Sequence, residues 1–354
     1  MANINKTPNK GRVIINIIFV LTMIIILQSC KSPTGPESLQ PGSRNYTWAV
    51  DTLNIPYTVL ECIWGSSPTD VWAVGPGGDL DKTIYHFDGS KWYNDGISRP
   101  LAPQAVFGFS SNDVWFGDDG FNSFWHYNGT TLSKFQDYTI PGYSNTGIIN
   151  IWGENPDNVY AAGYADSNNI YIGVIQHYTG IQWKIIYTSP HVSTYEVFAK
   201  ICGNIPEGND YILSYYGVNA DTNRLYEIAD NKLKLIYSDA TSSTGSANIS
   251  LIGKQVYFVI GNNICKWENN SFSPIFNVPE TSFSHSIYGR NGEDIFLEMT
   301  DGIAQYNGTD IQYIYKFSHP QIGLSSAVIF DKEVFFLAYD FQNQLNLIIR
   351  GTLN

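Results

Sequence analysis

The chain has little cysteine, little positive charge and no long apolar run. Four cysteines stand among 354 residues without any Cys-x-x-Cys spacing, which argues against a zinc site or a disulfide framework. Apart from Cys30, we expect Cys62, Cys202 and Cys265 to be small buried apolar residues. Twenty Lys and Arg against 32 Asp and Glu give a net charge of −12, which excludes nucleic acid as a partner because phosphate contacts need cationic side chains.

What the chain does have is a repeat of about 45 residues that recurs seven times. Its clearest copy contains four parts, Cys62–Gly65, Asp70–Gly75, Ile84–Gly89 and Trp92. A full copy provides four short β-like segments, and a repeat of this length with four strands is typical of a propeller blade. The second segment is almost wholly apolar, which indicates a strand that is buried on both faces.

Turn residues and glycines fit the same scheme. Asp88-Gly89, Asn128-Gly129 and Asn307-Gly308 follow the third segment, and we expect hairpin turns there with positive φ at both central positions. A glycine closes the first segment of most copies, which indicates a close approach of neighbouring chain at that point.

The seventh copy provides only three strands before the sequence stops at Asn354. The segment Tyr46–Asp51 has the character of an outermost strand, yet it precedes the first copy. We therefore predict an all-β fold, a seven-bladed β-propeller at 44–354 that is closed by an N-terminal strand completing the last blade. Closure of this kind would remove a strand edge able to template aggregation.

The units resemble a bacterial propeller-repeat family with the pattern VWG-SS-xDVWAVG…I-x-H-x-DG-xW, which is related in shape to Kelch-type and Asp-box propellers. The resemblance covers Arg44 to Leu353 and is strongest in the first three copies. It implies the propeller fold and little about activity, because propellers carry out many functions.

The N-terminus has the features of a secretory signal at 1–29. Lys6, Lys10 and Arg12 precede an apolar run, Val13–Leu27, that is shorter than the roughly 20 residues of a transmembrane helix. The run ends in Leu-Gln-Ser-Cys, which resembles the bacterial lipobox. On that resemblance, Cys30 becomes the mature N-terminus and carries a lipid such as palmitate; an uncleaved anchor or ordinary secretion is the alternative.

Residues 30–43 are rich in Pro, Gly and Ser, and we expect them to form a flexible tether between the lipid and the propeller. Lys31 is not the acidic residue that resembles an inner-membrane retention signal. We therefore expect a lipid-anchored protein of the bacterial cell envelope, at the outer membrane, with the periplasmic or surface orientation left open.

His86, His126 and His177 occupy the same third-strand position in successive copies. Three ligands must all reach one metal ion at about 2 Å, and equivalent positions of separate blades do not converge so closely. We expect each histidine to make a structural hydrogen bond. An aspartate likewise precedes most second strands, and its recurrence once per copy favours a turn role over catalysis. These residues are Asp70, Asp113, Asp157, Asp210 and Asp294.

The loops between the second and third strands are the better binding candidates, because scaffold loops carry binding more often than core strands do. Together with the connections between blades, they should line one face of the ring. Their acidic and aromatic side chains suit a basic partner, sugar hydroxyls or a calcium ion, although a plain solvated rim is the alternative. The candidates are Asp79, Asp81, Asp118, Asp119, Phe121, Tyr164 and Asp166.

The sequence contains no recognisable catalytic motif, and we assign no catalytic residue. We expect a monomeric, non-catalytic protein that binds a protein or glycan partner on this acidic loop face, with no required cofactor and calcium as the one metal left open. The first alternative is a glycan-active enzyme, a glycoside hydrolase or lyase, with carboxylates at the central channel. The second is a scaffold subunit of an outer-membrane complex.

Overall fold

The structure is a computed structural model that describes residues 42–55, 57–190, 195–204, 208–217, 221–229, 232–239 and 247–354. All of them belong to one compact unit, Pro41–Asn354. The predicted signal peptide, Cys30 and most of the predicted tether lie outside the described residues. None of the described segments forms a helix with the length and apolarity that a bilayer crossing requires.

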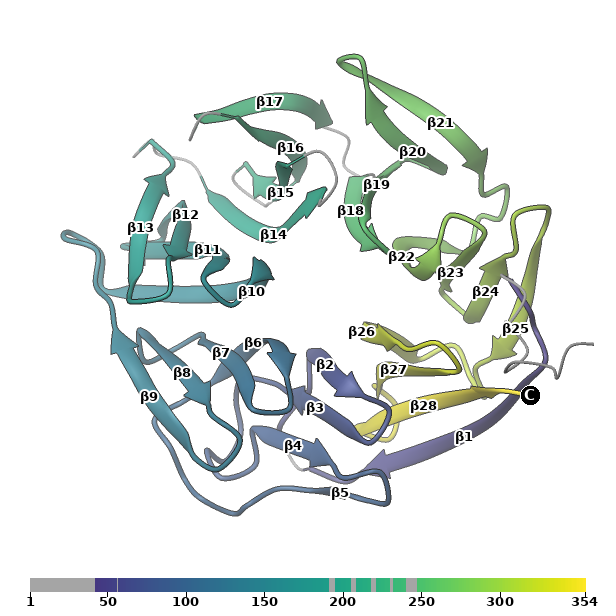
Figure 1. The fold of residues 1–354 in the computed structure, drawn as a ribbon, viewed down its shortest axis with the longest axis horizontal. Coiled ribbons are helices and arrows are strands. Elements are labelled where there is room, and N and C mark those ends of the chain that lie inside the picture. Colours follow the sequence, from purple (N-terminus) through teal and green to yellow (C-terminus); the bar gives the residue numbers. More distant parts are fainter. Residues whose placement is uncertain are drawn as a thin grey trace, which may run out of the picture. The chain divides into compact units, whose positions relative to one another are not determined.

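Within the described residues, 28 β-strands form seven four-stranded antiparallel sheets. The sheets are arranged around a ring as blades, with the first strand of each blade innermost (Figure 1). Blade 1 contains β2 (Cys62–Ser67), β3 (Asp70–Val74), β4 (Ile84–Phe87) and β5 (Trp92–Tyr93). Blade 2 contains β6 (Pro103–Ser110), β7 (Asp113–Asp118), β8 (Ser123–Tyr127) and β9 (Leu132–Asp137). Blade 3 contains β10 (Asn145–Asn155), β11 (Asn158–Ser167), β12 (Ile170–Tyr178) and β13 (Trp183–Thr188).

The next three blades repeat this order. Blade 4 contains β14 (Glu196–Asn204), β15 (Asn209–Tyr216), β16 (Thr222–Ala229) and β17 (Lys232–Asp239). Blade 5 contains β18 (Ala247–Ile252), β19 (Gln255–Ile260), β20 (Asn263–Glu268) and β21 (Ser271–Asn277). Blade 6 contains β22 (Phe283–Asn291), β23 (Asp294–Met299), β24 (Gly302–Tyr306) and β25 (Ile311–Lys316).

Blade 7 joins the two ends of the described chain. It contains β26 (Ile322–Ile329), β27 (Glu333–Asp340), β28 (Leu345–Leu353) and, as its outermost strand, β1 (Tyr46–Leu53). β1 pairs with β28 over its whole length, in the register that places Tyr46 opposite Leu353. Figure 1 shows β1 in purple beside β28 in yellow. The predicted seven-bladed propeller and its closure by an N-terminal strand are confirmed.

The core lies between neighbouring blades, as the apolar second strands predict. Val71 and Ala73 of β3 are fully buried, and they pack in one cluster with Phe335 and Leu337 of β27 in the adjoining blade. A propeller strand of this kind is covered on both faces, which is why its sequence shows no polar alternation.

The glycines that close the first strands make room for a neighbouring blade. A Cβ atom on Gly108 would lie 2.8 Å from the indole of Trp64 in blade 1, and one on Gly65 would lie 2.9 Å from the ring of Phe330 in blade 7. The predicted close approach is therefore made from two sides, by an aromatic side chain of the preceding blade and by the backbone oxygen of the aspartate that begins the next strand, Asp113 or Asp70.

The predicted turns need one correction. Gly89 has φ of 90°, but Asp88 is not among the residues with positive φ. Instead, the Asp88 carboxylate accepts hydrogen bonds from the backbone N–H groups of Ser90 and Lys91, both at 2.9 Å. Asn128 and Asn307 do the same in blades 2 and 6. The turn is therefore held by the side chain of its first residue, which is the other way in which Asp and Asn favour turns.

Candidate functional site

The three repeated histidines lie in three separate blades, where each bonds to the start of the second strand of its own sheet. His86 Nε2 lies 2.6 Å from Asp70, His126 Nε2 lies 2.7 Å from Asp113, and His177 Nε2 lies 2.7 Å from Asn158. The structural role is confirmed. In the described part of the chain, no group of three or more His, Cys, Asp or Glu side chains is placed to hold a metal ion.

The loops between second and third strands lie beside the connections between blades, as expected. The backbone N–H of Asp119 donates to Ala102 O at 2.8 Å, which joins the β7–β8 loop to the connection from blade 1 to blade 2. Ser144 N, in the connection from blade 2 to blade 3, donates to Asp166 O at 3.0 Å. Tyr164 and Asp166 were predicted to lie in a loop, but both belong to the last part of β11, which extends further than the sequence suggested. These two kinds of loop therefore form one face of the propeller.

Asp119 and Tyr164 are brought together on this face. The Tyr164 hydroxyl donates to Asp119 Oδ1 at 2.6 Å, across the boundary between blades 2 and 3. Burial raises the pKa of Asp119, and the nearby charges of Glu61 and Asp166 raise it further, although the hydrogen bond from Tyr164 acts in the opposite direction. Asp119 therefore lies among other carboxylates in a partly desolvated position.

Glu61 belongs to this cluster and was not among the predicted residues. It stands one residue before β2, and its Oε2 accepts a hydrogen bond from Gln104 of blade 2 at 2.9 Å. The sequence did not point to Glu61, because it lies directly before a first strand and not in a loop between second and third strands. We call Glu61, Asp119, Phe121, Tyr164 and Asp166 the acidic loop face.

The remaining predicted residues are placed differently. Asp118 is fully buried, and its carboxylate accepts hydrogen bonds from Ala102 N, Phe121 N and Ser123 Oγ at 2.8–3.0 Å. Burial raises the pKa of Asp118 to about 6, although these bonds act against the rise. The Asp118 side chain thus holds the β7–β8 loop together and does not face a partner.

Asp79 and Asp81 lie in the β3–β4 loop. Asp79 is exposed and forms an ion pair with Lys82, with Oδ2 and Nζ 2.7 Å apart. Phe121 is 44% exposed at the tip of the β7–β8 loop, two residues after Asp119. The structure therefore leaves Asp79 and Phe121 accessible, and it places Phe121 next to the Asp119–Tyr164 pair.

A second group of titratable side chains lies inside the ring. Lys200 of blade 4 is influenced by the charges of Cys62 in blade 1 and Glu298 in blade 6. Because these blades are not neighbours, such side chains meet only across the central axis. Burial lowers the pKa of Lys200, and burial raises the pKa of Glu298 to about 7, against opposing effects of Ser286 and Lys200.

The three expected buried thiols are free in the structure. Cys202 and Cys265 are buried, whereas Cys62 is only partly buried and its Sγ donates to Val106 O of blade 2 at 3.8 Å. Burial raises the pKa of all three thiols, and that of Cys202 reaches about 12. A thiol in this state is a poor nucleophile, which agrees with the predicted packing role.

Comparison with known proteins defines the class through the fold. No family model matches the chain, and no curated protein matches it in sequence. Among solved structures, virginiamycin B lyase from Staphylococcus aureus, in a catalytically inactive form with quinupristin, has a TM-score of 0.61 at 15% identity and covers 87% of this chain and 100% of its own. YCF48 bound to D1 peptide has a TM-score of 0.58 at 13% identity and covers 87% of this chain and 97% of its own.

A third similar structure is the Cps50 (Swd1) β-propeller domain of Myceliophteria thermophila, with a TM-score of 0.53 at 8% identity, covering 85% of this chain and 99% of its own. At these identities the similarity concerns the fold alone. The structures that the chain resembles thus include a lyase and a protein bound to a peptide, a range expected of this fold.

Proposed function

We propose that this protein is a lipid-anchored binding protein of the bacterial cell envelope, whose propeller captures a partner with basic groups on the acidic loop face. The observation that carries the proposal is the Asp119–Tyr164 pair, set among Glu61 and Asp166. Carboxylates that are held close together repel one another, and a cationic group of a partner would relieve that repulsion.

The composition of the face suits a protein partner. Phe121 offers an exposed aromatic side chain beside the carboxylates, and aromatic residues are enriched among the side chains that dominate binding energies at interfaces. Tyr164 adds a second ring, which stacks at a tilt against Tyr171 with centroids 5.4 Å apart. A glycan that uses the same carboxylates through its hydroxyls is the second kind of partner that the face could hold.

The test is capture of partners from detergent extracts by the purified full chain. We expect Asp119→Asn combined with Asp166→Asn to abolish capture, because the substitutions remove the charge and keep the shape. Asp137→Asn is the matched control, since Asp137 is an exposed carboxylate that pairs with Lys134 on β9. Retained capture by the double variant would overturn the assignment of the face. Stoichiometric co-purification of several envelope subunits would instead favour the scaffold alternative.

The membrane attachment rests on residues outside the described part of the chain. A positive start, the apolar run Val13–Leu27 and the cysteine that follows support lipid attachment at Cys30. Two or more acyl chains would supply the stable membrane affinity that a single acyl chain does not provide. Labelling with a palmitate analogue should mark the wild-type protein and not Cys30→Ser, and fractionation should place the label in the outer membrane. An unlabelled wild-type chain in the soluble fraction would overturn the anchor.

A second candidate function, glycan hydrolysis or cleavage inside the ring, is supported by Glu298. An acid whose pKa lies at about 7 is suited to donate and accept protons at neutral pH, and the Lys200 ammonium lies near enough to influence it. Screening of the full chain against bacterial and plant polysaccharides tests this candidate. Activity that is absent from Glu298→Gln would support it, and activity that the variant retains would remove it.

A further inference from the structure

Blade 1 departs from the other blades at its outer edge. Its fourth strand, β5, is two residues long, whereas the outermost strands of the other blades contain six to eight residues. β5 pairs only with His86 and Phe87 of β4. After Tyr93 the chain leaves the sheet, and Asn94–Arg99 runs as a loop toward blade 2.

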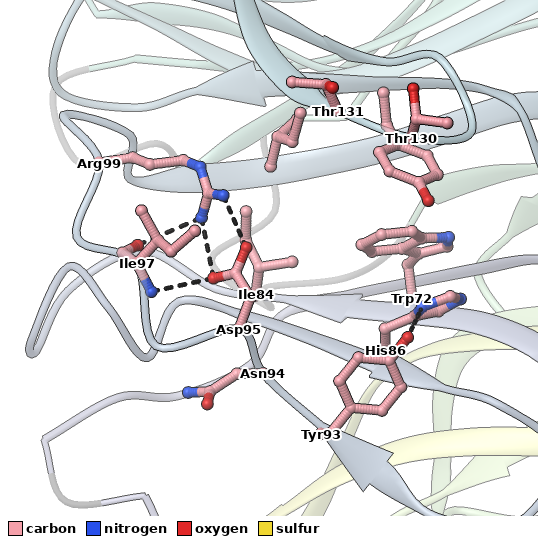
Figure 2. Close-up of a pocket in the computed structure, with 12 residues that line it drawn as sticks. Trp72, Ile84, His86, Tyr93, Asn94, Asp95, Ile97, Arg99, Thr130 and Thr131 are labelled. Atoms are coloured by element: carbon pink, nitrogen blue, oxygen red, sulfur yellow. Dashed lines mark hydrogen bonds and ion pairs between the residues drawn. The ribbon is translucent and has the colours of Figure 1, made fainter.

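The short strand leaves a pocket between blades 1 and 2, which we call the interblade pocket. Its volume is about 320 Å³, at the lower end of the roughly 300–1,000 Å³ of small-molecule sites. Trp72 and Tyr127 line one side, and the loop residues Asp95, Ile97 and Arg99 line the other. Figure 2 shows Arg99 and Asp95 facing the space across from Trp72.

The aromatic wall of the pocket is held rigidly. The Trp72 indole stacks on the His86 ring with centroids 3.9 Å apart and an angle of 11°, and it lies 5.1 Å from the ring of Tyr127. His86 is fixed in turn, because its Nε2 bonds to Asp70 and its Nδ1 bonds to the Tyr93 hydroxyl at 2.9 Å. A wall that is already ordered costs little entropy when a ligand binds.

The polar side of the pocket is an ion pair with two contacts. Arg99 Nη2 lies 2.6 Å from Asp95 Oδ2, and Nη1 lies 3.0 Å from Oδ1. Nη1 also donates to Ile97 O at 3.2 Å, and Ile97 N donates to Asp95 Oδ1 at 3.0 Å. The pair therefore fixes the loop and still offers a ligand both kinds of hydrogen bond. A guanidinium has five N–H donors, and a carboxylate has about four acceptor sites.

We propose that the interblade pocket binds a saccharide of one or two rings. A sugar ring has an apolar face of C–H groups, which suits the rings of Tyr127 and of Tyr93, the latter 40% exposed, while Trp72 is buried beneath His86. It also has an edge of hydroxyls that both donate and accept hydrogen bonds. Asp95 accepts from such hydroxyls, Arg99 donates to them, and Asn94 and Thr131 at the rim add further polar groups. The apolar rings with a few fixed polar groups match the general composition of ligand pockets.

Charge and shape favour a neutral ligand. Asp95 compensates the charge of Arg99 directly, so the pocket holds no unpaired charge that would select an anion or a cation. The pocket shares no residue with the acidic loop face, so the proposal stands apart from the proposed function. A neutral amino acid or short peptide could also suit such a pocket, so the experiment must distinguish its binding from that of a sugar.

The experiment uses the purified full chain in detergent on an array of neutral and acidic oligosaccharides, followed by saturation-transfer NMR with the array sugar that binds best. Ile97→Trp fills the pocket from a residue that is 53% exposed, so folding should be unaffected. Asp95→Ala with Arg99→Ala removes the polar side. We expect each variant to lose at least tenfold in affinity. Lys134→Gln with Asp137→Asn, an exposed ion pair on β9, is the matched control and should bind as wild type does.

Thermal unfolding of each variant separates loss of the site from loss of the fold. Three outcomes overturn the proposal: no array sugar binds, binding survives both pocket variants, or binding is lost instead in Asp119→Asn with Asp166→Asn. Direct binding of free amino acids or short peptides, without any sugar binding, would also overturn it, because it would assign the pocket to a different chemical class.

Discussion

His86 and Asp70 are joined by a hydrogen bond of 2.6 Å between Nε2 and Oδ1, which ties the third strand of blade 1 to the start of the second. Because an ionised carboxylate only accepts, His86 donates from Nε2, and its Nδ1 is free to accept from the Tyr93 hydroxyl. Gln305 and Asp294 make the same bond in blade 6, at 2.5 Å. A hydrogen bond between the third strand and the start of the second strand thus recurs in several blades.

Substitution of Asp70 tests this hydrogen bond. Asp70→Ala leaves the His86 N–H without its partner and should lower the free energy of unfolding by about 1–3 kcal/mol at pH 7. Asp70→Asn should cost less, because Asn158 serves naturally as the partner of His177 in blade 3. Denaturant unfolding of both variants measures the difference, and equal stability of Asp70→Ala and wild type would contradict the role.

The same pair has a pH dependence. Burial raises the pKa of Asp70, but the hydrogen bonds from His86 and Ser66 outweigh it and leave the pKa below its ordinary value of 3.8. A carboxyl group with a lowered pKa in the folded state stabilises the fold above pH 3.8 and ceases to do so as the pH falls through the folded-state pKa. The advantage of wild type over Asp70→Asn should therefore shrink between pH 7 and pH 3.

Deletion of Arg44–Leu53 tests the closure of the ring. It removes β1, exposes the edge of β28 and should strongly destabilise the domain. Trp48→Ala is a milder variant, which we expect to cost about 2–3 kcal/mol because the indole packs on Tyr315 and Phe336. Val50→Ala on the same strand is the control, since Val50 is 45% exposed. Unchanged thermal unfolding after the deletion would refute the closure.

Asp118 and Asp119 are neighbours with different roles, so a pair of alanine variants separates structure from binding. Asp118→Ala leaves three donors without an acceptor in a buried position and should cost about 2–3 kcal/mol of unfolding free energy. Asp119→Ala should cost less than about 1 kcal/mol, since its partner Tyr164 is only partly buried and water can replace the bond. Equal losses in denaturant unfolding would contradict this division.

Glu298→Gln tests the carboxyl group inside the ring. Because burial raises the folded-state pKa of Glu298 from 4.5 to about 7, the folded protein holds this proton more tightly than the unfolded chain does. The contribution of Glu298 to stability is therefore greatest below pH 4.5 and declines as the pH rises to about 7. We expect the variant to be more stable than wild type by about 1–2 kcal/mol at pH 8 and to show no advantage at pH 4. Equal effects at both pH values would contradict the shift.

Much of the fold could be predicted because its cues are local and repeated. The apolar second segments predicted buried strands, and the Asp-Gly and Asn-Gly pairs predicted turns. The strand-like segment before the first repeat predicted the strand that closes the ring. Even the missing fourth strand of blade 7 could be assigned from the sequence, to the segment that forms β1. The turn geometry at Asp88 was missed because Asp favours turns in two ways, and the sequence does not say which applies.

The sites were harder to predict because they depend on contacts between blades. Lys200 and Glu298 lie in non-adjacent blades, and no spacing along the chain brings them together. Asp118 ends β7 and Asp119 begins the loop that follows, and only the fold shows that the Asp118 side chain is buried. The interblade pocket did leave a signal, since Asn94-Asp95-Gly96 places turn residues where the other repeats continue their fourth strand.

The partnership of β1 with β28 has a consequence for biosynthesis. Thr47 and Asn354 are 307 positions apart, yet their side chains lie within a hydrogen bond of 3.0 Å. A ribosome makes the chain from its N-terminus, so β1 cannot pair with β28 until nearly the whole repeat array has been translated. During that interval β1 has no sheet to join. The ring can therefore close only after β28 has been made, later than in a fold whose strands all pair with their sequence neighbours.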